Sequence, residues 1–105
     1  MKEEEYDQVI DICQQILSLN SDSVEALNLI AKSSFAINKF ENSIVYFKRA
    51  LNIEPNRYEI MHSMGNSYLQ IGDINNAKKC YEKVISINST YAKSLTMLGV
   101  VFTRE

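Results

Sequence analysis

The sequence repeats a short pattern of large apolar and small residues every 34 positions, and this periodicity constrains the fold more than any other feature. In the middle copy, Met61 and Met64 are followed by Gly65. The same order recurs on either side, as Leu27, Ile30 and Ala31, and as Leu95, Leu98 and Gly99. A fixed period of about 20 to 50 residues is typical of supersecondary units stacked around one continuous core. We therefore expect an array of repeats.

Within each copy, apolar residues recur at three- and four-residue steps, the spacing of amphipathic helices. This spacing predicts six helices, at about residues 3–18, 24–37, 40–53, 58–71, 74–87 and 91–105. Pro55 ends the third helix, because proline cannot continue the hydrogen-bond ladder. Asn38 and Gly72 are 34 residues apart, and both suit the left-handed conformation that closes a helix. Such short connections force successive helices into antiparallel contact.

Two local features can be predicted within this frame. Asp22 and Asn56 are each followed three residues later by glutamate, a pattern typical of helix-capping pairs. Gly65 and Gly99 each follow a large apolar residue inside a helix. Because glycine in a helix interior costs about 1 kcal/mol relative to alanine, we expect both glycines to admit a closely packed neighbouring helix.

These positions resemble the tetratricopeptide repeat, a 34-residue helical pair with the pattern W-x₂-L-G-x₂-Y, then A-x₃-F, then P. Residues 24–57 match at Leu27, Ile30, Ala31, Ser43, Phe47, Ala50 and Pro55; residues 58–91 match at Met61, Met64, Gly65, Tyr68, Ala77 and Tyr81. Ser34 replaces the aromatic residue, and Ser89 replaces the proline. Residues 1–23 match the second half of a repeat, and residues 92–105 match the first half. The resemblance implies one all-α domain, a right-handed superhelical solenoid of antiparallel helix pairs.

In this family the first helices of the repeats line a concave groove that binds an extended or helical peptide. The resemblance implies a groove formed by Asn28, Lys32, Phe35, His62, Asn66, Gln70, Lys93, Thr96 and Arg104. Asn28 and Asn66 are the preferred contacts, because an amide can pair with both the donor and the acceptor of a peptide backbone. We expect His62 and Asn66 to face outward. The alternative for each residue is an ordinary solvated helix face.

Some members of the family hold the two carboxylates of a chaperone C-terminus with lysine, asparagine and arginine side chains. Here Asn66 and Lys93 match isolated positions of that clamp, while His62 and Met97 stand where a cation or an amide would be needed. We therefore expect a different ligand.

Other classes of function have little support in the sequence. One histidine and two cysteines without a CxxC spacing give neither a metal site nor a catalytic arrangement, so we expect no enzyme, metal or cofactor. Cys13 and Cys80 lie in apolar stretches, which favours buried free thiols in a reducing, cytoplasmic setting. A net charge of −2 disfavours nucleic acid, and no apolar run of roughly 18 residues predicts a membrane span. The start at Met1 lacks an apolar secretory segment.

The sequence therefore predicts a protein–protein interaction scaffold that binds a partner's peptide, as an excerpt of a larger repeat protein. Two alternatives stay open: the substrate-recruiting arm of a glycosyl- or methyltransferase whose catalytic domain lies elsewhere, and a stand-alone small chaperone or adaptor. An RNA-reading helical repeat is disfavoured by the acidic balance. The first and last helices are complementary halves of one repeat, which predicts head-to-tail association of copies.

Overall fold

In the computed structural model, residues 2–104 are described, and they form six α-helices without a β-strand. The helices are α1 (Glu3–Leu19), α2 (Val24–Ala36), α3 (Phe40–Ile53), α4 (Tyr58–Gln70), α5 (Ile74–Ile87) and α6 (Ala92–Arg104). Each boundary agrees with the predicted one to within one residue. Glu105, which the sequence assigns to the last half-repeat, lies outside the described residues. The prediction of an all-α array is confirmed.

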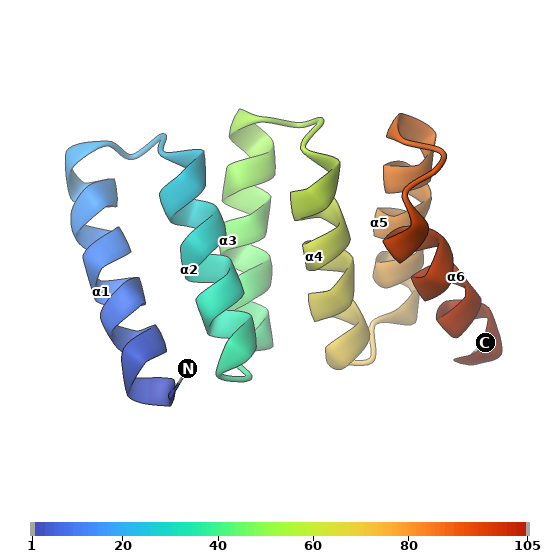
Figure 1. Ribbon diagram of the computed structural model, residues 1–105, viewed down its shortest axis with the longest axis horizontal. Helices are drawn as coiled ribbons and strands as arrows, with labels where there is room; N and C mark the ends of the chain where they lie inside the picture. Colours follow the sequence, from blue (N-terminus) through green and yellow to red (C-terminus); the bar gives the residue numbers. More distant parts are fainter. Residues whose placement is uncertain (1, 105) are drawn as a thin grey trace.

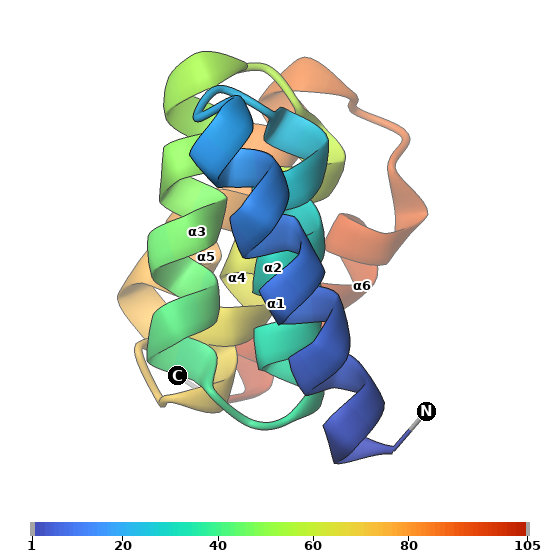
Figure 2. The same ribbon diagram turned by 90° about the vertical axis from the view of Figure 1, so that its left-hand side faces the viewer.

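The helices form a row in which each runs antiparallel to the next (Figure 1). Consecutive helices make nearly all the tertiary contacts, and the molecule measures 40 × 27 × 19 Å. Seen from the α1 end, α3 and α5 lie on one side of the row and α4 and α6 on the other (Figure 2). The first helices α4 and α6 therefore lie in one layer of the solenoid and the second helices α3 and α5 in the other, while α1 crosses in front of α2 in this view.

The core consists of two apolar clusters that run into each other. The first is centred on Leu27 and Phe47, and the second on Tyr81 and Val84, all at most 1% exposed. Met64 packs against both clusters. The core is therefore continuous along the row, as a stack of repeats requires.

Gly65 lies where α4 packs closely on α5. A Cβ atom at this position would lie 2.7 Å from Cε1 of Tyr81 and 3.1 Å from Cβ of Cys80. The predicted close approach is confirmed here. At Gly99 the same prediction is wrong, because a Cβ atom would meet nothing within 4 Å. The reason is that α5 packs on another face of α6, and no other helix of residues 2–104 covers the face that carries Gly99.

The turns that end α2 and α4 have the same geometry. Asn38 has φ = 65° and Gly72 has φ = 81°, which confirms the predicted left-handed conformations. In both turns a backbone N–H returns to a carbonyl five residues earlier, from Lys39 to Ser34 at 2.8 Å and from Asp73 to Tyr68 at 2.9 Å. These bonds satisfy carbonyls that would otherwise lack a partner at the helix end.

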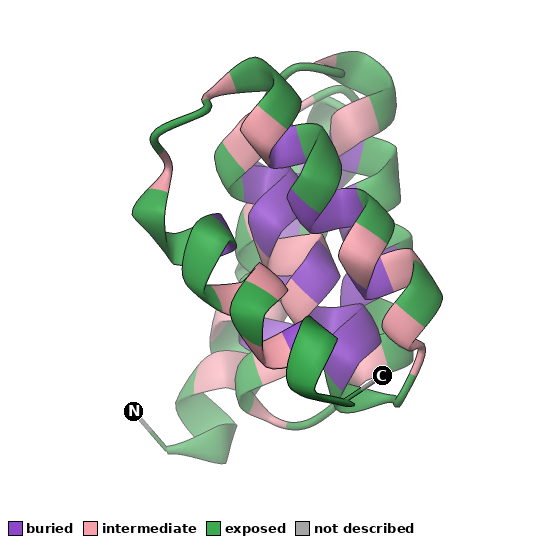
Figure 3. Ribbon diagram, turned by 90° about the vertical axis from the view of Figure 1, so that its right-hand side faces the viewer, coloured by how far each residue is buried: buried purple, intermediate pink, exposed green. Residues whose placement is uncertain are grey.

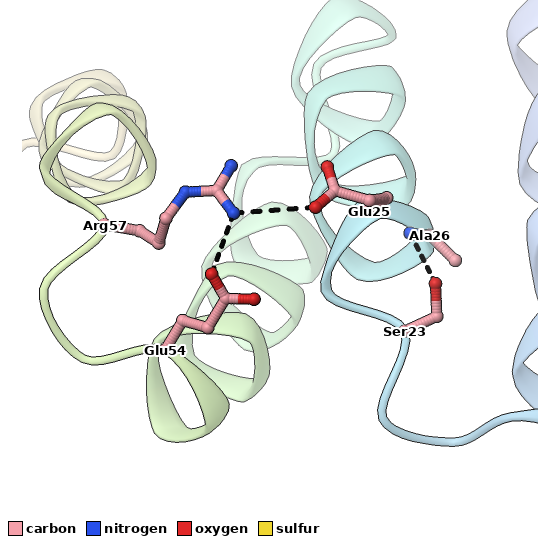
Figure 4. A network of polar contacts seen from close by, with 5 residues as sticks. All are labelled: Ser23, Glu25, Ala26, Glu54 and Arg57. Carbon is pink, nitrogen blue, oxygen red and sulfur yellow. Dashed lines mark hydrogen bonds and ion pairs between the residues drawn. The ribbon is translucent and has the colours of Figure 1, made fainter.

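The predicted capping residues before α2 and α4 are wrong. Ser23, rather than Asp22, accepts a hydrogen bond from the backbone N–H of Ala26, at 3.2 Å. Before α4 the N-cap is Arg57, which makes no side-chain capping bond. The Arg57 guanidinium instead pairs with Glu54 at 3.0 Å and Glu25 at 3.5 Å (Figure 4). In both cases the predicted residue stands one position too early to be the N-cap.

Candidate functional site

A pocket of about 190 Å³ lies between α2 and α4. Lys32 and Phe35 line it from α2, Ser63 and Asn66 from α4, and Phe47 from α3. Three of these five residues, Lys32, Phe35 and Asn66, belong to the predicted groove. The structure thus brings together part of the predicted set on neighbouring first helices of two repeats.

The pocket combines an apolar wall with polar groups. Phe35 packs edge-to-face on Phe40 with ring centroids 5.1 Å apart, which fixes the orientation of that wall. Lys32 is exposed and makes no ion pair with another described residue. The Ser63 hydroxyl donates to the carbonyl of Glu59 at 3.1 Å, so its oxygen can still accept a hydrogen bond. The site can therefore hold an apolar group beside an anionic one.

Asn66 is held in place by α5. Its Oδ1 accepts a hydrogen bond from the Tyr81 hydroxyl at 2.6 Å, and its Nδ2 lies 3.4 Å from Nε2 of His62. The amide oxygen therefore already accepts one hydrogen bond, and the amide N–H₂ group keeps one N–H for a ligand. The predicted simultaneous pairing with a donor and an acceptor of a peptide backbone would have to use the second lone pair of the oxygen that already accepts from Tyr81.

The prediction that His62 faces outward is wrong, because the side chain is buried, with the residue 8% exposed. Its ring lies 5.5 Å from the rings of Tyr81 and Tyr91, and its Nδ1 lies 2.7 Å from Oγ of the buried Ser94. The helix spacing places His62 opposite much of the α4 core stripe. Tyr81 of α5, together with Tyr91 and Ser94 at the start of α6, covers it there. The periodicity of a single helix does not reveal these contacts.

These contacts define a directional hydrogen-bond chain across three helices. The Tyr81 hydroxyl donates to Oδ1 of Asn66, the Asn66 N–H₂ group, which can only donate, faces Nε2 of His62, and Nδ1 of His62 lies 2.7 Å from Oγ of Ser94. This order places the proton of a neutral imidazole on Nδ1. Burial, with a smaller contribution from the charge of Lys93, lowers the pKa of His62. The structure therefore favours the neutral ring.

Asn28 is the counterpart of His62 one repeat earlier, and its surroundings differ. Its Oδ1 is buried and has no hydrogen-bond partner. The residue equivalent to Ser94 in that repeat is Ile60, which cannot donate a hydrogen bond. Asn28 therefore does not present its amide oxygen to solvent, and it is less suited to hold a peptide than its sequence position indicates.

The remaining predicted residues lie away from the pocket. Gln70, Lys93, Thr96 and Arg104 are all exposed, and the Thr96 hydroxyl donates to the carbonyl of Ala92 in its own helix at 2.9 Å. The sequence interpretation missed Phe47 and Ser63. Ser63 precedes Asn66 by one helical step of three residues, so a stripe counted from Asn66 would have included it.

The described residues hold no group of three His, Cys, Asp or Glu side chains that could bind a metal ion. Cys13 and Cys80 are buried free thiols, and burial raises the pKa of Cys80 to about 11. No helix within residues 2–104 has the length and apolar character needed to cross a bilayer.

Two consecutive segments, residues 24–57 and 58–91, match the family model described as tetratricopeptide repeat. Together they cover more than half of the sequence. The chain belongs to the tetratricopeptide repeat family. The repeat boundaries of this model coincide with the two full repeats expected from the 34-residue period. In tetratricopeptide terms, α2 and α4 are the first helices of the two matched repeats.

Two human proteins each contain a region that is similar in sequence to this chain. Aspartyl/asparaginyl beta-hydroxylase is 32% identical over 90 residues, which are 80% of this chain and 12% of that protein. Anaphase-promoting complex subunit 7 is 25% identical over 96 residues, which are 91% of this chain and 17% of that protein. The tetratricopeptide chain thus spans only a small part of the length of either relative.

Among solved structures, the first tetratricopeptide domain of Spaghetti (RPAP3), bound to the HSP90 peptide SRMEEVD, superposes with a TM-score of 0.92. The alignment covers 96% of this chain and 80% of that domain, at 17% sequence identity. The likeness establishes a shared tetratricopeptide fold.

Proposed function

We propose that this chain is a protein–protein interaction module that binds an extended peptide segment of a partner in the pocket between α2 and α4. The observation that carries the proposal is the pocket itself, where an apolar wall and three polar side chains meet on neighbouring first helices. Support also comes from the structural neighbour with the same fold, which holds a peptide.

The residues of the pocket favour a particular kind of segment. Phe35 offers aromatic surface to one apolar side chain, while the Lys32 ammonium offers a charge to an acidic one. The N–H₂ group of Asn66 can donate to a backbone carbonyl. The preferred peptide therefore carries an acidic residue next to an apolar residue.

The experiment is selection from a phage-displayed peptide library, followed by affinity measurement with the best peptide and the Lys32→Ala and Phe35→Ala variants. Both variants should weaken binding, and the loss at Lys32 should shrink in high salt because exposed charges are screened. Lys79→Ala is the matched control, since Lys79 is an exposed lysine on α5, outside the pocket. Unchanged affinity in both pocket variants would overturn the proposal.

A second candidate is the recruiting arm of an enzyme. It is favoured by the 32% identity to a hydroxylase of which this chain matches 12%. In that case the same pocket would bind a peptide of the substrate protein. A recruiting arm belongs to a protein with a catalytic domain, and in that protein Lys32→Ala should raise KM for a substrate that carries the bound peptide. An unchanged KM would argue against the arm.

A further inference from the structure

Tyr81 of α5 is the largest fully buried side chain in the described part of the chain, yet it carries a polar hydroxyl group. Seen from the end of the row at which α5 and α6 lie, the buried residues gather between the helices (Figure 3). Burial raises the pKa of Tyr81, so the hydroxyl keeps its proton at neutral pH and can donate it to an acceptor. At 0% exposure, Tyr81 cannot contact a bound peptide itself.

The hydroxyl of Tyr81 donates to Oδ1 of Asn66 at 2.6 Å. A separation this short is typical of an O–H···O bond, since bonds between nitrogen and oxygen centre near about 2.9 Å, and the oxygen of the amide therefore faces Tyr81. The amide nitrogen lies 3.4 Å from Nε2 of His62. If the amide turned through half a rotation, its oxygen would face Nε2, and both atoms are acceptors when the imidazole proton is on Nδ1. The two neighbours thus favour one orientation of the Asn66 amide.

The Tyr81 ring is confined where it passes α4. At Gly65 the helix presents only backbone, and a Cβ atom there would lie 2.7 Å from Cε1 and 3.1 Å from Cδ1 of the ring. The ring centroid of His62 lies 5.5 Å from that of Tyr81. The ring therefore has little room to move, and its hydroxyl stays beside Asn66, the residue that follows Gly65.

The preceding repeat lacks this hydrogen bond at the same two positions. Counting back 34 residues, Phe47 takes the place of Tyr81, and Lys32 takes the place of Asn66. Phe47 is 1% exposed, so an aromatic ring fills the core in both repeats. The hydroxyl is present in the repeat that has an amide in the pocket, and it is missing in the repeat that has a lysine there. Packing of the core explains the ring of Tyr81 but not its hydroxyl.

We propose that Tyr81 is a positioning residue of the peptide pocket and determines which hydrogen-bonding group Asn66 presents to a bound peptide. This inference rests on the proposed function and deepens it. With its oxygen facing Tyr81, Asn66 directs its remaining N–H at the peptide and pairs with a backbone carbonyl rather than with a backbone N–H. Without the hydroxyl the amide can turn, and part of the binding free energy is then lost in orienting it.

The experiment is isothermal titration calorimetry with the peptide selected from the library on the wild-type chain, using Tyr81→Phe, Asn66→Ala and the double variant. Tyr81→Phe removes only the hydroxyl and should weaken binding by about 3- to 10-fold, the equivalent of one hydrogen bond. In the double variant the tyrosine substitution should add nothing to the loss caused by Asn66→Ala, because its effect passes through the amide. Tyr46→Phe is the matched control: the Tyr46 hydroxyl accepts from Gln14 outside the pocket, so this variant should bind like the wild type.

Thioamide analogues of the same peptide test which backbone group Asn66 recognises. Replacing one carbonyl oxygen at a time by sulfur weakens the acceptor and makes the adjoining N–H a stronger donor. One analogue should bind the wild type more weakly, and the same analogue should lose less affinity with Tyr81→Phe. An analogue that binds the wild type more tightly than the parent peptide, and loses this gain with Asn66→Ala, would contradict the proposal, because Asn66 would then accept from a backbone N–H.

The pocket variants separate failure of this inference from failure of the proposed function. Full affinity in Tyr81→Phe, together with weaker binding in Lys32→Ala and Phe35→Ala, would overturn the positioning role and leave the pocket as the binding site. Equal losses from Tyr81→Phe with and without the Asn66 amide would also overturn it, because they indicate a general loosening of α4 against α5. Unchanged binding in both pocket variants removes the pocket, and the role of Tyr81 with it. Thermal unfolding of each variant shows that it is folded at the temperature of the titration.

Discussion

At the scale of single residues, packing at Gly65 and at Gly99 should give opposite responses to the same substitution. A methyl group at Gly65 meets the Tyr81 ring, which cannot move freely because its hydroxyl is bonded to Asn66. Gly65→Ala should therefore lower the free energy of unfolding by about 1–3 kcal/mol, as overpacking does. Gly99→Ala meets nothing and should raise it by up to about 1 kcal/mol through helix propensity. Urea unfolding of both variants at low protein concentration measures the difference, and equal effects would contradict this account.

The buried His62 should make stability depend on pH. Its pKa is lowered in the folded state by burial and by Lys93, so below about pH 6.5 the unfolded chain binds the proton more strongly. Protonation would also direct an N–H group of the ring at the N–H₂ group of Asn66, both of them donors. The free energy of unfolding should therefore fall as the pH drops from about 7.5 to 5.5.

The variant His62→Gln is the control for this pH effect. His62 is the one histidine of the sequence, so the variant has no side chain whose ordinary pKa lies in this range. Thermal unfolding at both pH values should show a larger decrease of Tm in the wild type than in the variant. Equal decreases would indicate that carboxylates cause the change.

At the scale of helices and turns, the N-cap of α2 is Ser23 in the structure, whereas the sequence predicts Asp22. Two substitutions can distinguish these residues. Ser23→Ala removes the hydrogen bond to the Ala26 N–H and should lower the free energy of unfolding by about 1 kcal/mol. Asp22→Ala, one residue earlier, should have a smaller effect, since its side chain makes no capping bond. Chemical denaturation of the two variants decides between them, and a larger loss at Asp22 would favour the capping pair predicted from sequence.

The turn after α4 depends on a left-handed residue. Gly72 has φ = 81° with open space around it, so Gly72→Ala introduces backbone strain without a steric clash. The expected loss is about 1–2 kcal/mol in free energy of unfolding. Gly72→Asn should cost less, because asparagine tolerates this conformation and already adopts it at Asn38. Similar losses in both variants would argue against strain as the cause.

The helices could be predicted from the sequence because their apolar spacing and their turn residues point to the same boundaries. The caps could not, since a shift of one residue between Asp22 and Ser23 leaves the apolar pattern unchanged. For the pocket, the helical spacing within α2 and within α4 identified Lys32, Phe35 and Asn66. It could not show that α6 covers His62 through Ser94, because that contact depends on how neighbouring first helices are spaced in the stack.

At the scale of the whole molecule, stability should vary along the row. In a stack of repeats each unit contacts only its neighbours, and within residues 2–104 α1 packs mainly on α2 whereas α5 lies between α4 and α6. Cys13 of α1 and Cys80 of α5 are both buried, and burial raises the pKa of both thiols. Labelling by a thiol reagent therefore requires opening of the structure. Cys13 should react faster than Cys80 at low protein concentration, as mass spectrometry of the labelled peptides would show.

The unpaired oxygen of Asn28 has a consequence for how this array can be rearranged. His62 finds a hydroxyl at Ser94, but the corresponding place beside Asn28 holds Ile60. If the two central repeats were exchanged, Asn28 would come to stand before Ser94 and could gain its missing bond, while His62 would stand before Ala26 and lose its own. The two repeats are therefore alike in backbone but not interchangeable, because the polar pair of His62 and Ser94 at one junction has no counterpart between Asn28 and Ile60 at the other.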